Sequence, residues 1–135
     1  MSYSSATQQY KDVGAFSGTA YADPHRLIQM LMQGAVDKIA IAKCALYDEN
    51  VAVKGENISK AISIIDGLRA SLDKEKGGSI ASNLDDLYDY MQRALVEGNL
   101  HNDVNKFDEV VSLMTEIKEA WDTIPLEVRE QYAGS

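Results

Sequence analysis

The sequence is poor in residues that interrupt helices or form covalent cross-links. Its only two prolines, Pro24 and Pro125, lie near the two ends of a 135-residue chain, so no proline forces a helix to break between them. Cys44 is the only cysteine, which excludes an internal disulfide and fits a reducing compartment. We expect Cys44 to be a small buried apolar residue.

The chain also lacks an apolar run long enough to span a membrane, and its polar start, MSYSSATQQY, has no signal-peptide pattern. We therefore expect a cytoplasmic protein that does not insert into a membrane. Basic residues are few, with 13 Lys and Arg against 21 Asp and Glu, a net charge of −8. Nucleic-acid binding needs clustered basic residues, so we expect no nucleic-acid partner.

The excess of acidic residues lies in the last third of the chain. Residues 85–135 hold twelve acidic residues and four basic ones, whereas residues 1–84 hold nine of each. Two interpretations remain open: a solvated acidic face, or a face that attracts a basic partner and repels acidic chains.

Patterns that would support metal binding or catalysis are missing. The segment that begins at Asp73 resembles a calcium loop, but the twelfth position, which must be a bidentate Glu, is Leu84. His25 is isolated and His101 follows Glu97 by four residues, so the Glu-x-x-His pairs of di-iron bundles are absent. With no Gly-rich phosphate loop and no nucleophile set, we expect no metal, no cofactor and no enzyme activity.

The chain is rich instead in apolar residues at helical spacing, and 45% of its residues are hydrophobic. Asp23-Pro24 is a typical helix start, Gly77-Gly78 is expected to end the second helix and Ser79 to cap the third. The prediction is an all-α fold, an antiparallel up-and-down four-helix bundle. Its parts are an N-terminal arm (1–21), a bundle (22–124) with helices at about 24–47, 52–76, 80–98 and 103–122, and a short C-terminal helical turn or tail (125–135).

Three features suggest apolar surface beyond the core. Residues 1–21 carry three tyrosines with Val13 and Phe16 but no clean period, so they form either a frayed end or an arm that lies in a groove. The first helix has apolar residues on more than one face. Tyr88 and Tyr90 are two positions apart, about 200° around a helix, so both rings cannot face one core. A groove that receives a helix from another protein fits these features.

The chain resembles the flagellin-specific export chaperones of bacterial flagellar secretion, the FliS family. The resemblance covers nearly all of residues 10–122, and the combination of SLD, GG and LYDYM is specific to the family. It departs from the family at Met32-Gln33, where Tyr-Asp is common, and at Gly98-Asn99, where Ala-Asn is common. The matching segments are ADPHRLIQMLMQGA (22–35), KAISIIDGL (60–68), SLDKEKGGSIASNLDDLYDYM (71–91) and EIKEAW (116–121).

The resemblance implies a cytoplasmic, non-catalytic bundle that holds the C-terminal segment of flagellin in apolar grooves. Such binding blocks premature polymerisation and delivers flagellin to the export gate. In the family the N-terminal arm can cover the binding surface of the free chaperone, and Tyr10 matches its tyrosine. A monomer or weak dimer is expected when the protein is free.

The candidate partner contacts are apolar or aromatic residues of the arm, the first helix and the third helix. They are Tyr10, Val13, Leu27, Met30, Leu31, Tyr88, Tyr90 and Met91. Several of them are equally good core residues. The alternative function is a self-associating structural or regulatory bundle. Binding to the export gate, a co-chaperone or the flagellar anti-sigma factor is left open.

Overall fold

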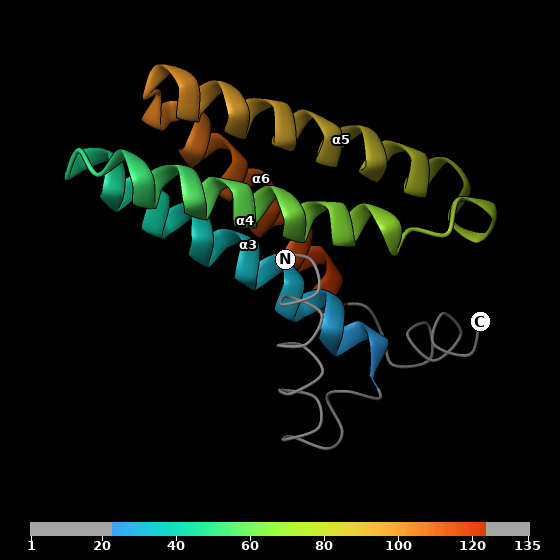
Figure 1. The fold of residues 1–135 in the computed structure, drawn as a ribbon. Coiled ribbons are helices and arrows are strands. Elements are labelled where there is room, and N and C mark those ends of the chain that lie inside the picture. The colour runs from blue at the N-terminus through green and yellow to red at the C-terminus, as the bar shows by residue number, and fades with distance from the viewer. Residues whose placement is uncertain (1–22, 124–135) are drawn as a thin grey trace.

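The computed structural model describes residues 23–123, which form four helices and no strand within that range (Figure 1). In chain order the helices are α3 (Pro24–Tyr47), α4 (Val51–Ala70), α5 (Lys74–His101) and α6 (Val104–Asp122). Each runs antiparallel to the one before it, as the colour gradient in Figure 1 makes visible. The predicted all-α four-helix bundle is confirmed. The predicted arm and tail lie outside the described residues.

Each helix begins at a side chain that accepts hydrogen bonds from the otherwise unpaired N–H groups of the first turn. Asp23 accepts from the backbone N–H of His25 and precedes Pro24, as predicted. Asp103 caps α6 in the same way, at the residue where the last helix was expected to begin. The other two caps are Asn50 for α4 and Asp73 for α5.

The connection between α4 and α5 differs from the prediction. Helix α4 ends at Ala70 rather than near residue 76, because Ser71 donates its backbone N–H and its hydroxyl to carbonyls of the last turn. Asp73 then accepts from two N–H groups and starts α5. Gly77-Gly78 is therefore inside α5, where Gly78 has φ +53° and ψ −128° and kinks the helix. The N-cap of α5 is Asp73 and not the predicted Ser79. The predicted left-handed glycine is present at Gly78, but it separates the first turn of α5 from the rest of that helix instead of ending α4.

The far end of α5 also extends beyond the predicted residue 98. The helix runs through Gly98 to His101 and closes at Asn102, which adopts the left-handed conformation with φ +52°. Asparagine is one of the few non-glycine residues that tolerates this region. The turn to α6 is consequently only two residues, Asn102 and Asp103.

Replacing Gly78 with alanine should destabilise the protein by about 1–3 kcal/mol, because a side chain is strained at this backbone conformation. A Cβ at residue 78 would meet no atom within 4 Å, so the cost is one of backbone strain alone. Gly55→Ala is the matched control: Gly55 is helical with equally open space, and alanine there should stabilise by about 0.5–1 kcal/mol. Urea denaturation of both variants measures the difference. Equal effects would contradict the assigned kink.

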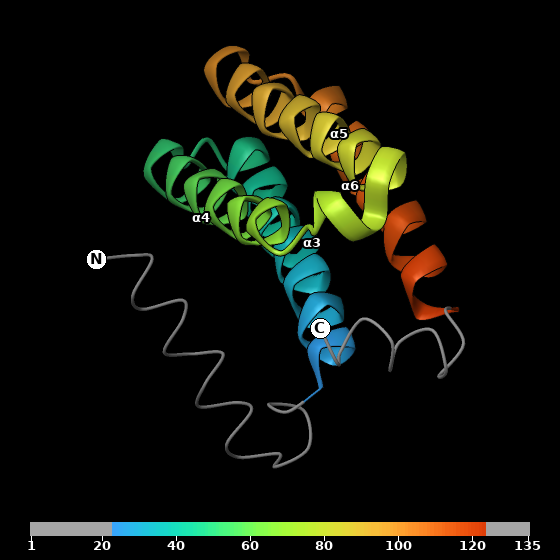
Figure 2. The same ribbon diagram turned by 90° about the vertical axis from the view of Figure 1, so that its right-hand side faces the viewer.

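The four helices form a closed ring in which α3 packs against α4 and α6, and α5 packs against the same two helices (Figure 2). Side chains from all four meet at the centre. The first helix was expected to be apolar on more than one face, and two of its additional apolar residues enlarge this core: Met32 is buried, and Val36 packs against the core cluster. The largest fully buried side chains are Phe107, Met32, Ile39, Ile65, Leu68, Met91, Leu95, Met114 and Val110.

Candidate functional site

The predicted contacts on the first helix occupy its half-buried outer side. Leu31 packs against the core cluster, whereas Leu27 and Met30 are half-buried and lie outside that cluster. Ile41 follows Met30 by eleven residues, about 20° around the helix, and 44% of it is exposed. We call Leu27, Met30 and Ile41 the α3 strip. These apolar residues share one side of α3, where the exposed Asp37 lies between Met30 and Ile41.

Cys44 lies close to the α3 strip and is exposed. The expectation that it is a buried apolar residue is wrong. The reason is its register: Ala42 and Ala45 take the buried positions of this turn of α3, so the residue between them and next to Ala45 faces outward.

The two tyrosines of the third helix have different environments, as predicted from their spacing. Tyr88 is 2% exposed and belongs to the core, and burial raises the pKa of its hydroxyl to about 12. Met91 is fully buried beside it in the same cluster. Tyr90 is half-buried, and its hydroxyl donates to Glu109 at 2.6 Å. This hydrogen bond is the main cause that raises the pKa of Tyr90. Of these two tyrosines, only Tyr90 has accessible surface that a partner could contact.

Another group of exposed apolar residues was missed in the sequence. Tyr47 and Val51 flank the turn from α3 to α4, and Leu100 lies in the last turn of α5 with Val96 one turn before it. Both turns are at the same end of the bundle (Figure 1). Leu100 is 70% exposed and Val51 72%. The sequence does carry a signal for part of this group. Val96 and Leu100 are four residues apart, so they share one side of the helix, and neither belongs to the repeat of core residues that ends at Leu95. We call these four residues the turn-end cluster.

A buried lysine holds this end of the bundle together. Lys54, in the first turn of α4, donates from Nζ to the backbone carbonyl of Asn99 at 2.9 Å and to the side chain of Asn102. Carbonyls at a helix C-terminus carry partial negative charge, so a lysine there is favourable. Lys54 is 5% exposed. It therefore joins the start of α4 to the end of α5.

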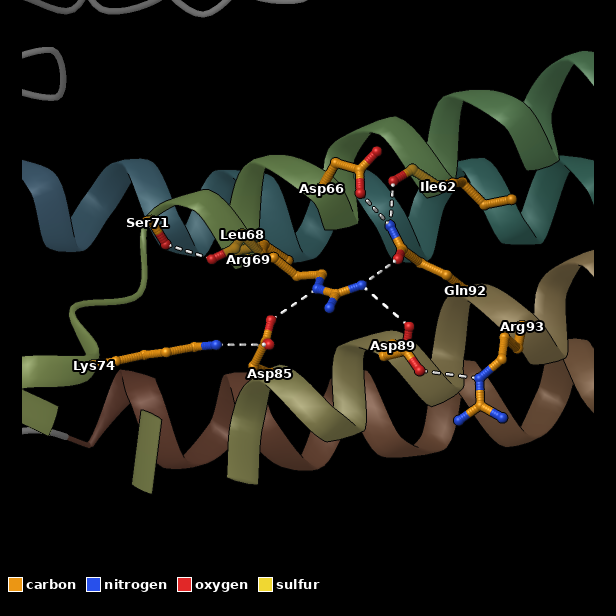
Figure 3. A network of polar contacts seen from close by, with 10 residues as sticks. All are labelled: Ile62, Asp66, Leu68, Arg69, Ser71, Lys74, Asp85, Asp89, Gln92 and Arg93. Atoms are coloured by element: carbon orange, nitrogen blue, oxygen red, sulfur yellow. Dashed lines mark hydrogen bonds and ion pairs between the residues drawn. The ribbon is translucent and has the colours of Figure 1, made fainter. Parts of the chain in front are cut away.

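The seam between α4 and α5 has polar side chains on its outer side (Figure 3). Arg69 of α4 donates from Nε to Asp85 at 2.7 Å and from Nη1 to Gln92 at 2.9 Å. Gln92 in turn donates from Nε2 to Asp66 at 2.7 Å and to the carbonyl of Ile62 at 3.1 Å. Each side-chain group contacts the opposite helix. The network fixes the register of the two helices and offers no apolar surface.

Acid should weaken this network before it affects the core. The hydrogen bond from Arg69, followed by that from Lys74, lowers the pKa of Asp85 from 3.8 to about 2. A carboxylate with a lowered folded-state pKa stabilises the fold above its unfolded-state pKa and loses that contribution as the pH falls from about 4 to about 2. Asp85→Asn should therefore be less stable than the parent protein at pH 7 and nearly equal to it at pH 2. Urea denaturation at both pH values tests this.

Asp86→Asn controls for the loss of one negative charge, because Asp86 is an exposed neighbour on the same helix. Its effect should not follow the same pH course. A deficit in Asp85→Asn that persists unchanged at pH 2 would contradict the ionic role of Asp85.

The described residues contain neither a cluster of metal ligands nor a membrane-spanning helix. No group of three or more His, Cys, Asp or Glu side chains between residues 23 and 123 could hold a metal ion. Asp73, the first position of the rejected calcium loop, uses its carboxylate to cap α5. Of the helices in this range, none is long and apolar enough to cross a membrane.

Comparison with known proteins decides the family. The model of the family described as flagellar protein FliS matches residues 6–128. The chain belongs to the FliS family. It is 49% identical to the flagellar secretion chaperone FliSB of Pseudomonas aeruginosa over 119 residues, which cover 88% of the chain and 94% of that protein. The corresponding values for FliS of Salmonella typhimurium are 48% over 121 residues, covering 89% and 90%.

A more distant relative also matches most of the chain. FliS of Bacillus subtilis is 32% identical over 114 residues, 84% of each chain. These relatives are named flagellar secretion chaperones, so the FliS family is a chaperone family and not an enzyme family. The chain shares that class, which supports an export-chaperone role and agrees with the prediction that it is not an enzyme.

Proposed function

We propose that this protein is a cytoplasmic export chaperone that binds the C-terminal helical segment of flagellin. It prevents premature polymerisation and delivers the subunit to the flagellar export apparatus. Membership of the FliS family carries the proposal. The motif SLDKEKGGSIASNLDDLYDYM, residues 71–91, supports flagellin as the partner because it resembles the corresponding segment of the flagellin-specific chaperones.

The surface of α3 gives the proposal a physical basis. An amphipathic helix presents apolar residues at positions i, i+3 or i+4 and i+7, and it buries them best against a complementary apolar line on another protein. The α3 strip offers apolar side chains for such contacts, with Leu27 and Met30 half-buried near the start of the helix and Ile41 further along it. Polymerisation-prone helices that bind here are kept from pairing with one another.

Among the predicted contacts, we propose Leu27, Met30, Leu31 and Tyr90 as residues that touch the partner directly. All four are half-buried and keep some accessible surface. Tyr88 and Met91 support these contacts from the core beneath. Tyr10 and Val13 lie outside the described residues and stay predictions.

Met30→Glu tests this assignment, because it places a charge in the α3 strip without touching the core cluster. We expect the affinity for flagellin's C-terminal segment to fall at least tenfold, since burying an unpaired carboxylate opposes binding. Leu100→Glu is the control, because it places the same charge on another apolar side chain of the surface, one that is 70% exposed at the turn end, and it should leave the affinity within about twofold. Titration calorimetry measures both. Equal losses, or none, would contradict binding at the α3 strip.

The turn-end cluster supports a second candidate function, self-association into a structural or regulatory oligomer. Tyr47, Val51, Val96 and Leu100 are each large, apolar and exposed, and they lie at or near two turns at the same end of the bundle; exposed apolar surface of this kind can mark an interface. Sedimentation at increasing concentration separates the two functions. A self-associating protein stays oligomeric when flagellin is added and loses its oligomers in Leu100→Glu, whereas a chaperone forms a one-to-one complex.

A further inference from the structure

The first and last helices are joined by a reciprocal contact between two side chains. His25, in the first turn of α3, donates from Nε2 to the backbone carbonyl of Trp121 at 2.7 Å. Trp121, near the end of α6, donates from Nε1 to the backbone carbonyl of His25 at 3.0 Å. The two rings are stacked, with centroids 4.8 Å apart and planes 10° from parallel. We call this pair the His25–Trp121 latch.

The latch lies where the chain itself provides no connection. Short turns join α3 to α4, α4 to α5 and α5 to α6, but α3 and α6 are the first and last described helices and no turn closes their seam. The start of α3 and the end of α6 meet at one end of the bundle (Figure 2). A third hydrogen bond, Gln29 to Asp122 at 2.6 Å, lies beside the latch but is exposed. The latch is less exposed than this bond, because His25 is 4% exposed and Trp121 is half-buried.

Both terminal segments are covalently attached next to the latch. Residues 1–22 join α3 at Asp23, two residues before His25, and residues 124–135 join α6 at Thr123, two residues after Trp121. A force or a bound partner on either segment therefore acts within two residues of the latch. Because each member donates to the backbone of the other, loss of either hydrogen bond removes part of the link between the two helices.

We propose that the His25–Trp121 latch makes the start of α3 and the end of α6 open and close as one unit, so that the two terminal segments are coupled through it. The latch is a conformational device at the seam between α3 and α6. It opens locally while the rest of the bundle stays folded, as low-stability units of a structure commonly do. This inference goes beyond the export-chaperone function and does not depend on which partner the protein binds.

Hydrogen exchange of the full chain tests the coupling without any mutation. Backbone amides of residues 28–32 and 118–122 donate inside their helices on either side of the latch. If they open as one unit, the two groups have the same protection factor, and it is lower than that of the core amides of α4. Unrelated protection factors at the two sites would contradict the proposal.

Two variants test the latch itself. His25→Phe keeps a stacking ring but removes the Nε2 donor, and Trp121→Phe removes the indole donor. Each should speed exchange at both groups of amides by roughly fivefold to tenfold, the effect of one lost hydrogen bond. The double variant should exchange little faster than either single variant, because the two hydrogen bonds act as one coupled unit and their losses are not additive. Acceleration confined to the substituted helix would overturn the coupling.

Lys43→Met is the control from the same seam. Lys43 forms an exposed ion pair with Asp108 at 2.7 Å, away from the end of the bundle that holds the latch. Exposed ion pairs contribute little to stability. Exchange at 28–32 and 118–122 should not change in this variant. Loss of protection throughout the bundle in His25→Phe would show a global support instead of a local latch, and would equally refute the proposal.

Discussion

Replacing Tyr88 with alanine lowers the free energy of unfolding by about 3–5 kcal/mol, the usual effect of removing a buried aromatic ring. Tyr88 is 2% exposed and packs in the central cluster with Met91 and Leu95. Its removal leaves a cavity that the surrounding helices can fill only in part. Urea denaturation followed by circular dichroism at 222 nm, the usual helix signal, measures the change in midpoint.

Tyr90→Ala is the matched control, because it removes the same atoms two residues away. Tyr90 is half-buried, and its hydroxyl meets an exposed carboxylate, that of Glu109. Its removal should cost about 1 kcal/mol, typical of a partly exposed site. If both variants lose equal stability, or if Tyr88→Ala weakens only partner binding, the assignment of Tyr88 to the core is wrong.

Phe107→Ala should destabilise the bundle by a similar amount, about 3–5 kcal/mol. Phe107 is fully buried at the start of α6 and lies directly over Gly98 of α5. A Cβ at residue 98 would come within 2.9 Å of the Phe107 ring. The glycine allows the two helices to approach, and the ring fills the space between them. Thermal and urea unfolding of the variant measure the loss.

The converse substitution, Gly98→Ala, supplies the internal check. It should cost about 1–3 kcal/mol in the parent protein, because overpacking forces the ring or the helix to move. In the Phe107→Ala background the same substitution should cost less, since the clashing ring is absent and only the contact with the Lys106 Cβ, at 3.0 Å, is left. Additive losses would contradict a direct contact between the two positions.

The number and order of helices could be predicted because each helix carries its own local signals. Asp23-Pro24 and Asp103 start helices as their chemistry requires, and apolar residues repeat at helical spacing between them. These signals act within a few residues, so they do not depend on the rest of the fold. The antiparallel order followed from the short connections.

The α4–α5 turn was misplaced because two local signals compete there. Gly77-Gly78 is a common helix end, but Ser71 and Asp73, seven and five residues before Gly78, satisfy the free backbone groups of the two helix ends. Once Ser71 and Asp73 make the turn, the flexibility of Gly78 is used for a kink within α5. Local propensity alone does not rank these alternatives, since each glycine and each cap contributes about 1 kcal/mol.

The candidate site was harder to predict than the fold. The spacing of Tyr88 and Tyr90 showed that their environments differ, but not which ring is buried, since that depends on the rotation of α5 against its neighbours. The His25–Trp121 latch joins residues 96 positions apart, and no local period connects them. Lys54 was missed for the same reason, because its acceptors belong to another helix.

Titration calorimetry of the full chain with flagellin's C-terminal segment tests the central claim most directly, with a sizing column run in parallel. The account predicts a one-to-one complex, a negative heat-capacity change from burial of apolar surface, and a gain of helix in the segment as it folds on binding. Absence of both heat and complex with well-folded protein would contradict the proposed function.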